Sequence, residues 1–393
     1  MKYDFDKITD RTGTDAVKYS ALEEIFGRAD LLPRGVADMD VETPDFITDA
    51  LRRRMDHPLF GYTAVPDGLW PTVARWIEEH HGWKADEKWM TFIPGVMKGV
   101  GAAVNVFVKP DEKVIIQPPV YYPFRLTPQG NGRQVVYNPL RRLADGSYEM
   151  DFEQLARITD AKCRMLILCN PHNPAGICWS RETLVRLADF CYDRHILVVS
   201  DEIHCDLTLF GNRHLPFAAV SDKAAGISIT FGAPSKTFNT AGIVNSYAVV
   251  PDDTLRRKFF AWLTANGLNS PHLFAPIAMM AAFRHGEAWR RQLISYIEQN
   301  VLFTEDYLRR CIPSVKPLRP QATFLVWLDC NQLGLDHKGL TDLFVNKAHL
   351  AMNDGEMFGP GGEGFMRLNV GTPRAVLSQA LGRLSDALRK GRD

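Results

Sequence analysis

The sequence has no excess of either charge and no long hydrophobic run. Its 393 residues include 46 Lys and Arg and 46 Asp and Glu, so a surface for nucleic acid or for a membrane is not expected. No apolar run reaches the length of a transmembrane helix. The opening segment, MKYDFDKITDRTGTD, is polar, so we expect neither a secretion signal nor a membrane anchor there.

Cysteine pairs with the spacing of a metal or redox motif are also absent. The seven cysteines form no CxxC pair, and their number is odd. Several of them lie in apolar runs such as MLILCN and VWLDC, in which a free thiol packs as a small hydrophobic group. This pattern argues against a disulfide framework or a structural zinc site, and it favours the reducing cytoplasm.

Instead of repeats or linkers, the chain contains short apolar runs that alternate with amphipathic segments. One amphipathic segment is SRETLVRLADFCYDRH, a helical pattern that Ser180 would cap. Strands alternating with helices predict βαβ units and an α/β fold, with a mostly parallel sheet covered by helices. The runs that predict strands buried on both faces are 113–117, 164–169, 196–200, 226–231 and 245–250.

The C-terminal part of the sequence has a different pattern. Residues 322–329 and 364–371 have the character of strands in a smaller α+β unit, and a long helical region at about 287–311 would join the two parts. We therefore expect two domains, a large one at 49–288 and a small one made of 1–48 and 289–393.

Polar side chains follow the ends of four predicted strands. Ligands of open α/β sheets bind outside the carboxyl ends of the strands, so these side chains should meet at one edge. Each one alone has a simpler explanation, as a core aromatic, a turn residue, a helix N-cap or a surface lysine. Four such strand ends in succession are hard to explain by structure alone. The residues are Tyr121 in PPVYYP, Asn173 in NPHNPAG, Asp201 and His204 in SDEIH, and Lys236 in APSKTFN.

A helical pattern at 93–107 begins directly after Pro94 and Gly95. The start of such a helix offers free backbone N–H groups and the positive end of the helix dipole to an anion. Glycine is also common at helix starts for steric reasons, so this feature alone is a weak indication of an anion site.

Together these residue types match one cofactor, pyridoxal 5′-phosphate (PLP). A lysine amine can form a Schiff base with its aldehyde, and a carboxylate can keep its pyridine nitrogen protonated. An amide can bond the phenolic oxygen, a tyrosine can stack on the ring, and a helix start with Ser235 can hold the phosphate. The small residues around Lys236 would leave room for a flat ring, and desolvation would favour its neutral amine.

The motifs NPHNPAG, SDEIH, APSKTFN and FMRLNVG, in this order and spacing, resemble the class I/II aminotransferase-like family of fold-type I PLP enzymes. The resemblance covers nearly the whole chain. ADLLPRGVADMDVETP (29–44), FGYT (60–63) and SDEIHCDL (200–207) are similar to the cystathionine β-lyase-type C–S lyase branch of that family. The resemblance implies a large PLP-binding domain, a smaller α+β domain and a homodimer.

The resemblance also implies roles for the motif residues at the cofactor ring. Lys236 would be the Schiff-base lysine, and Asp201 would pair with the pyridine nitrogen. Asn173 would contact the phenolic oxygen, and Tyr121 would stack on the ring. His204 would lie beside the cofactor, where transaminases of the family often carry a tyrosine, and this difference fits the lyase branch.

Further roles concern the phosphate and the substrate. The amides of Val96 and Met97 would bind the phosphate together with Ser235, and Tyr62 would reach the phosphate of the neighbouring subunit's cofactor. The family often has a serine three residues before the lysine and an arginine eight residues after it. Here these positions are Ala233 and Val244, which leaves the phosphate contacts open.

Arg367 would bind the α-carboxylate of an amino-acid substrate, because a guanidinium fits a carboxylate through two parallel hydrogen bonds. Ala37, in the ADMD segment, would also lie at the substrate.

The function that these features imply is a C–S β-lyase acting on cystathionine or another S-substituted cysteine. Lys236 would take the α-proton as general base, the thiolate would leave from Cβ, and the remainder would give pyruvate and ammonia. One alternative is an aminotransferase, since the fold and the cofactor do not fix the reaction. Another is a regulatory or binding protein that uses the same fold, for which an added DNA-binding domain would be expected.

Overall fold

The apolar runs of the sequence form a seven-stranded sheet in the computed structural model, which describes residues 2–390. Six strands run in one direction, and β10 runs against both of its neighbours. The predicted α/β fold with a mostly parallel sheet is therefore confirmed. The strand order is β2 (Met90–Ile93), β10 (Ser246–Val249), β9 (Ser228–Gly232), β8 (Leu197–Asp201), β7 (Cys163–Cys169), β3 (Lys113–Ile116) and β4 (Gln134–Tyr137).

All five predicted runs are strands of this sheet, but β2 and β4 were not predicted. β4 is an edge strand whose residues are exposed or only half-buried. β2 has only four residues, MTFI, and directly follows a single helical turn.

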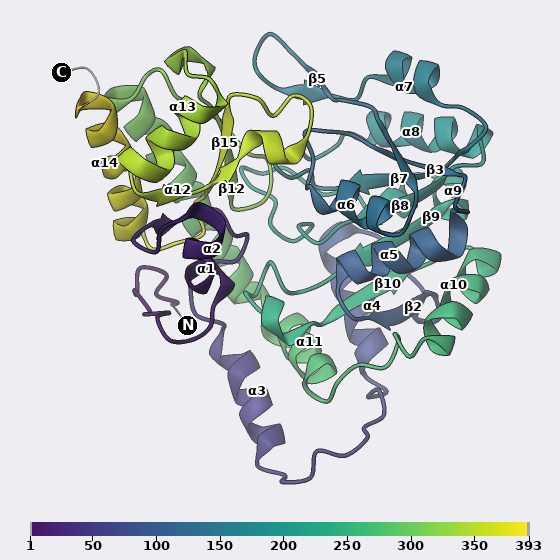
Figure 1. The fold of residues 1–393 in the computed structure, drawn as a ribbon. Coiled ribbons are helices and arrows are strands. Elements are labelled where there is room, and N and C mark those ends of the chain that lie inside the picture. Colours follow the sequence, from purple (N-terminus) through teal and green to yellow (C-terminus); the bar gives the residue numbers. More distant parts are fainter. Residues whose placement is uncertain (1, 391–393) are drawn as a thin grey trace.

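Strand β7 shows why the predicted strands are apolar on both faces. Met165 and Ile167 pack in the hydrophobic core beneath α5 (Val96–Phe107), whereas Leu166 and Leu168 pack in the core beneath α8 (Arg181–Asp193). Both faces of the sheet are thus covered by helices (Figure 1). The other helices of this lobe are α4 (Leu69–His81), α6 (Pro123–Gly130), α7 (Phe152–Ile158), α9 (Asp222–Gly226), α10 (Asp253–Ala265) and α11 (Phe274–His285).

Helix α8 begins where the sequence predicts. The Ser180 side chain accepts a hydrogen bond from the backbone N–H of Thr183 at 3.1 Å, which satisfies one of the free donors at the helix start.

A second sheet of four antiparallel strands lies in the other lobe, together with the long helix α12 (Glu287–Cys311) and both ends of the described chain (Figure 1). Its strands, in order, are β11 (Lys316–Leu318), β12 (Leu325–Asp329), β15 (Phe365–Asn369) and β14 (Asn353–Asp354). The helices of this lobe are α1 (Val17–Ser20), α2 (Leu22–Phe26), α13 (His337–Thr341) and α14 (Arg374–Lys390).

The N-terminal segment joins this second lobe through a short parallel pair, β1 (Leu32–Pro33) with β13 (Leu350–Ala351). The domain limits expected from the sequence remain a prediction. The remaining elements are the β5 (Arg141–Arg142) and β6 (Tyr148–Glu149) hairpin, 3₁₀ turns at Glu87–Trp89, Phe217–Ala219, Ala241–Ile243, Asn331–Leu333 and Gly355–Phe358, and a π-helical segment at Asp342–Lys347.

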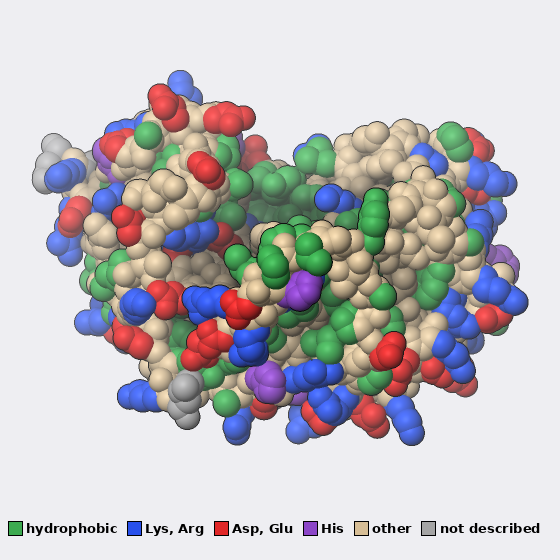
Figure 2. Space-filling view, turned by 90° about the horizontal axis from the view of Figure 1, so that it is seen from below, with side chains coloured by type: hydrophobic (Ala, Val, Ile, Leu, Met, Phe, Trp, Pro, Cys, Tyr) green, Lys and Arg blue, Asp and Glu red, His purple; other side chains and the backbone are tan. Residues whose placement is uncertain are grey.

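Helix α3 (Asp45–Met55) packs against α11, and its C-terminal end and the connection that follows extend away from both lobes (Figure 1). Figure 2 views the molecule from the side of this projection and shows hydrophobic side chains gathered between the lobes. The projection itself exposes large apolar side chains, with Met55 57% exposed, Leu59 68%, Phe60 59% and Tyr62 fully exposed. Among residues 2–390, no helix combines the length and the apolar character needed to cross a bilayer.

Candidate active site

A cavity of about 310 Å³ opens at the carboxyl ends of β7, β8 and β9. This volume is at the lower end of the range of small-molecule sites, about 300–1,000 Å³. The cavity brings together residues that are far apart in the sequence. Of the predicted site residues, it is lined by Ala37, Val96, Met97, Tyr121, Asn173, Asp201, His204, Ser235 and Lys236.

Lys236 lies in the turn that follows β9, half-buried at the wall of the cavity. Its Nζ donates a hydrogen bond to the backbone carbonyl of Ala37 at 2.7 Å. Burial, helped by the positive charge of Arg367, lowers the pKa of the Lys236 amine to about 8. The amine is therefore easier to deprotonate than an ordinary lysine, as the sequence predicts for a nucleophile or base.

Asp201 is the last residue of β8, and its carboxyl faces the cavity. Its Oδ1 accepts a hydrogen bond from the backbone N–H of Ile203 at 3.1 Å. Burial raises the pKa of this carboxyl to about 7, although that hydrogen bond and the charge of Lys236 act in the opposite direction. A cationic group in the cavity would therefore be stabilised here, because it would compensate the buried negative charge.

His204 lies beside Asp201 with a neutral ring. Burial, together with the charges of Lys236 and Arg367, lowers the pKa of the imidazole well below its usual value. Its Nδ1 is buried and has no hydrogen-bond partner within the described residues. The ring lines the cavity and packs edge-on against Phe324, with the centroids 6.1 Å apart.

Asn173 links the cavity to the second lobe. Its Oδ1 accepts a hydrogen bond from Nη1 of Arg367 at 2.9 Å, so its amide N–H₂ is left for another acceptor. Its backbone carbonyl accepts from the N–H of Tyr121 at 3.1 Å, and burial raises the pKa of the Tyr121 phenol to about 12. Tyr121 is therefore a neutral ring at this wall of the cavity.

Arg367 comes from β15 of the second sheet and is buried directly behind Asn173. Its Nη2 donates to the carbonyl of Gly35 at 2.9 Å and to Oδ1 of Asn353 at 2.5 Å. Its Nε is buried without a partner among residues 2–390. A guanidinium with an unused donor thus stands next to the cavity, although it does not line it.

The opposite end of the cavity is formed by the start of α5. Gly95, with φ 111° and ψ 143°, turns the chain into this helix, in a backbone conformation that favours glycine. Val96, Met97 and Lys98 follow and line the cavity, as do Ser235 and Asn245. The first N–H groups of a helix have no intrahelical acceptor, so this end suits an anion.

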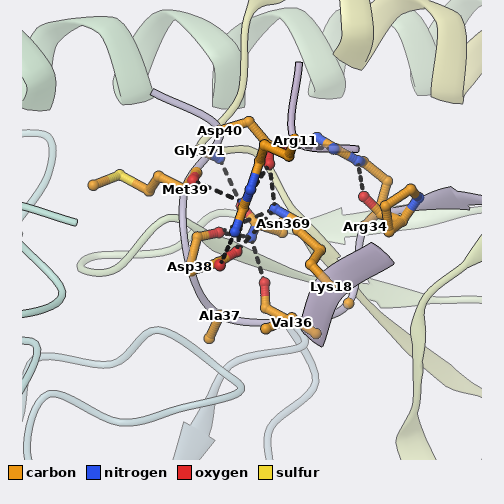
Figure 3. A network of polar contacts seen from close by, with 12 residues as sticks. Arg11, Lys18, Arg34, Val36, Ala37, Asp38, Met39, Asp40, Asn369 and Gly371 are labelled. Atoms are coloured by element: carbon orange, nitrogen blue, oxygen red, sulfur yellow. Dashed lines mark hydrogen bonds and ion pairs between the residues drawn. The ribbon is translucent and has the colours of Figure 1, made fainter. Parts of the chain in front are cut away.

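The segment Val36–Asp40, of which Ala37 lines the cavity, is held in place by a network of charges (Figure 3). Asp40 accepts hydrogen bonds from Lys18 at 2.8 Å, from Arg34 at 2.5 Å and from Arg11 at 3.0 Å. Burial opposes ionisation of Asp40, but the charges of Lys18 and Arg34 hold the pKa of its carboxyl well below its usual range.

The same segment is fixed from the second sheet. Nδ2 of Asn369, on β15, donates to the carbonyls of Val36 and Asp38, both at 2.7 Å (Figure 3). The carbonyl of Ala37 lies between these two anchored residues and accepts the hydrogen bond from Lys236. The ADMD segment therefore has a structural task, which is to present this carbonyl to the lysine.

The comparisons with known proteins agree with this geometry. The model of the family "Aminotransferase class I and II" matches residues 33–384 of the chain. The chain belongs to this family.

Within the class I and II aminotransferase family, the relatives of this chain include C–S lyases. It is 45% identical over 385 residues to cystathionine beta-lyase PatB of Bacillus subtilis, covering 98% of this chain and 99% of PatB. Cystalysin from Treponema denticola, which contains PLP, is 31% identical, with a TM-score of 0.95 over 99% of this chain and all of that one. The PLP-bound C–S lyase of Staphylococcus hominis is 29% identical, with a TM-score of 0.91 over 99% of this chain and 98% of that one.

Tyr62, which the sequence predicts to contact the cofactor, does not lie at the cavity of its own chain. Tyr62 lies in the projection after α3 and is fully exposed. It does not line the cavity, so within one chain it is not brought together with the other predicted site residues.

Sequence reasoning missed the residues that support the site of this family member from behind. Thr237, next to Lys236, donates to Oδ2 of Asp206 at 3.3 Å, and Oδ1 of Asp206 accepts from Trp76 at 3.0 Å. His81 also bonds Asp206, at 2.9 Å. Asp206 lies within the SDEIHCDL segment, but nothing in its spacing indicates these partners. Lys98 and Asn245, which also line the cavity, were missed too.

Proposed function

We propose that this chain is a PLP-dependent C–S β-lyase that cleaves cystathionine or a related S-substituted cysteine to a thiol, pyruvate and ammonia. The observation that carries the proposal is Lys236. Its amine, which has a lowered pKa, faces the same cavity as Asp201 and Asn173, in a chain that is 45% identical to a cystathionine beta-lyase.

The side chains at the cavity fit PLP. Asp201 has a buried carboxyl that forms no ion pair within residues 2–390, so it can pair with a protonated pyridine nitrogen. The amide N–H₂ of Asn173 has no acceptor among the described residues and can donate to a phenolic oxygen, while its Oδ1 accepts from Arg367. Tyr121 and His204 present neutral rings, and the start of α5 with Ser235 suits a phosphate.

When bound, PLP supplies an electron sink for the negative charge that develops at the substrate Cα. Lys236 takes the proton from Cα, a task for which a pKa near 8 is suitable. Arg367 binds the substrate α-carboxylate and so orients Cα toward Lys236, with Ala37 at the same place. Asp201 stays ionised and keeps the proton on the ring nitrogen, which favours the developing charge.

The leaving group then decides between elimination and transamination. A thiolate on Cβ is a good leaving group, so S-substituted cysteines should yield pyruvate catalytically without any α-keto acid. Alanine, which has no leaving group on Cβ, should give at most slow conversion. The measurement is pyruvate release from L-cystathionine and from alanine, each with and without an added α-keto acid.

An aminotransferase would give a different result in this assay. Turnover that depends strictly on the α-keto acid, with no pyruvate from L-cystathionine in its absence, would establish transamination as the activity and contradict the lyase proposal. Binding of PLP without turnover of any amino acid would instead favour the third alternative, a regulatory or binding protein.

We also propose a cytoplasmic homodimer with two equivalent sites. The projection after α3 exposes Leu59, Phe60 and Tyr62 as neighbouring apolar side chains, which is typical of an interaction surface. A two-fold axis would let each projection reach the other subunit's cavity, so that Tyr62 contacts the phosphate of the partner's cofactor. The free thiols, two of them half-buried and the rest buried, are consistent with a reducing compartment.

We also propose that the chain has two domains, a large one at 49–288 and a small one made of 1–48 and 289–393.

Subunit mixing tests the shared site. Lys236→Ala and Tyr62→Ala homodimers should both have low activity, because each lacks a component of every site. A mixed dimer would contain one site with both defects and one with neither, so activity should recover toward half of the wild-type value per mixed dimer. Mixing is verified by tagging the two variants differently. If exchange occurs and activity does not recover, Tyr62 does not serve the partner's site.

A further inference from the structure

We propose that Lys98 and Asn245 bind the phosphate of the cofactor and together take the place of an arginine at this end of the cavity. The assignment rests on the proposed function, since it presumes that PLP occupies the cavity. It concerns side chains that the sequence motifs do not single out.

Of the described residues, Lys98 is the one that brings a cationic side chain to the phosphate end of the cavity. The cavity wall contains two lysines and no arginine, and the other lysine, Lys236, belongs to the turn after β9. Lys98 lies in the first turn of α5, directly after Val96 and Met97, whose backbone N–H groups have no acceptor within the helix. Lys98 is exposed at the cavity wall, and none of the hydrogen bonds or ion pairs found among residues 2–390 involves its ammonium. A lysine in the first turn of a helix is unfavourable with respect to the helix dipole, unless an anion is bound there.

Asn245 supplies an orphaned amide at the same end. It is 1% exposed, and neither its Nδ2 nor its Oδ1 has a hydrogen-bond partner within the described part of the chain. A buried side-chain amide without partners is costly, so its presence calls for a ligand. It directly precedes Ser246, which pairs with Ile93 next to the start of α5, and it lines the cavity there.

The backbone turns Asn245 into this position. Val244 adopts φ 53° and ψ 64°, a left-handed conformation that is rare for a β-branched residue. The side chains of Val244 and Ala233 have no hydrogen-bond donor, although the family often has an arginine and a serine at these two positions. The phosphate charge at this end therefore has one cation, Lys98, with the amide of Asn245, the hydroxyl of Ser235 and the helix N–H groups as further donors.

The experiment compares two ligands that differ only in the phosphate. Apo-protein is titrated with PLP and with pyridoxal, which has the same ring and aldehyde but no phosphate, and binding is followed by absorbance. The variants are Lys98→Met and Asn245→Leu, which remove the polar groups at similar size, and Asn245→Asp, which adds a negative charge. Lys109→Met is the matched control, because Lys109 is exposed just beyond the other end of α5.

Lys98→Met and Asn245→Leu should each weaken PLP binding about 10- to 100-fold, as expected for a hydrogen bond to a charged group, and Asn245→Asp should weaken it further. Pyridoxal affinity should change less than about twofold in all variants, and Lys109→Met should behave as wild type. Inorganic phosphate should compete with PLP for wild type, and less well for Lys98→Met. The ³¹P resonance of bound PLP should titrate at higher pH in Lys98→Met, because a nearby cation favours the dianion.

The two levels of the proposal can fail separately. A wild-type protein that does not bind PLP would overturn the proposed function and this assignment together. PLP binding by wild type, with equal losses for PLP and pyridoxal in the variants or with losses no larger than in Lys109→Met, would overturn this assignment alone.

Discussion

Replacing Lys236 with alanine is expected to abolish turnover and to remove the visible absorbance of the protein-bound cofactor. A methyl group can neither bond the cofactor aldehyde nor accept the Cα proton, and the cavity offers no second base in this place. His204 is neutral, but it is held beside Asp201 with a pKa far below neutrality, so it is a poor base. The loss should reach at least three orders of magnitude in kcat/KM, about 4 kcal/mol.

The absorbance measurement has a chemical counterpart. Reduction of the wild-type holoenzyme with borohydride should fix the cofactor to the peptide that contains Lys236, as read by mass spectrometry. Lys223→Ala, which removes a surface lysine paired with Asp189, should keep both the absorbance and the activity. A borohydride-fixed cofactor in Lys236→Ala would show that another lysine holds it.

The placement of the strand-end residues could be predicted from the sequence because the topology of a parallel sheet determines it. Asp201 ends β8, and Tyr121, Asn173 and Lys236 follow the ends of other strands. Strands that run in one direction end at one edge, so whatever follows them meets there. Once five apolar runs were identified as buried parallel strands, the edge that carries the site followed without any knowledge of side-chain contacts.

The contacts that tune the site could not be predicted, because they join segments with no regular spacing. The carbonyl of Ala37 lies 199 positions from Lys236, and only the paired lobes bring them together. Asp40 pairs with Lys18, which lies on the short helix α1, and with Arg34, which directly follows β1. A buried carboxylate gives no sign in sequence of which cation will neutralise it.

Asn245 is another residue whose place in the site could not be predicted from the sequence. Its sequence neighbours suggest an ordinary strand start, and only the structure shows that its amide is buried without partners beside the cavity. The contact expected for Tyr62 is with the cofactor of a second subunit, so the structure of one chain, in which Tyr62 is exposed, does not show it.

Replacing Asp201 with asparagine is expected to change activity and apo-protein stability in opposite directions. Asparagine keeps the size of the side chain and an oxygen for the Ile203 N–H, but it loses the charge that holds a proton on the ring nitrogen. Activity should fall by at least two to three orders of magnitude, about 3–4 kcal/mol at about 1.36 kcal/mol per tenfold. Asp189→Asn, on the exposed face of α8, should leave activity unchanged.

The apo-protein should become more stable in the same variant, and the gain should depend on pH. Burial raises the pKa of Asp201 in the folded apo-protein to about 7, above the value of about 4 in an unfolded chain. Below about pH 4 the carboxyl is protonated in both states, so it costs the folded protein no free energy of unfolding. As pH rises from about 4 through 7, the unfolded chain ionises more easily than the folded one, and this stability is lost. The asparagine variant lacks this loss, so its Tm should exceed that of wild-type apo-protein at pH 8, and the difference should shrink at pH 5.5. Wild-type turnover in Asp201→Asn, or a variant apo-protein that is less stable at pH 8, would exclude an ionised Asp201 as the partner of the ring nitrogen.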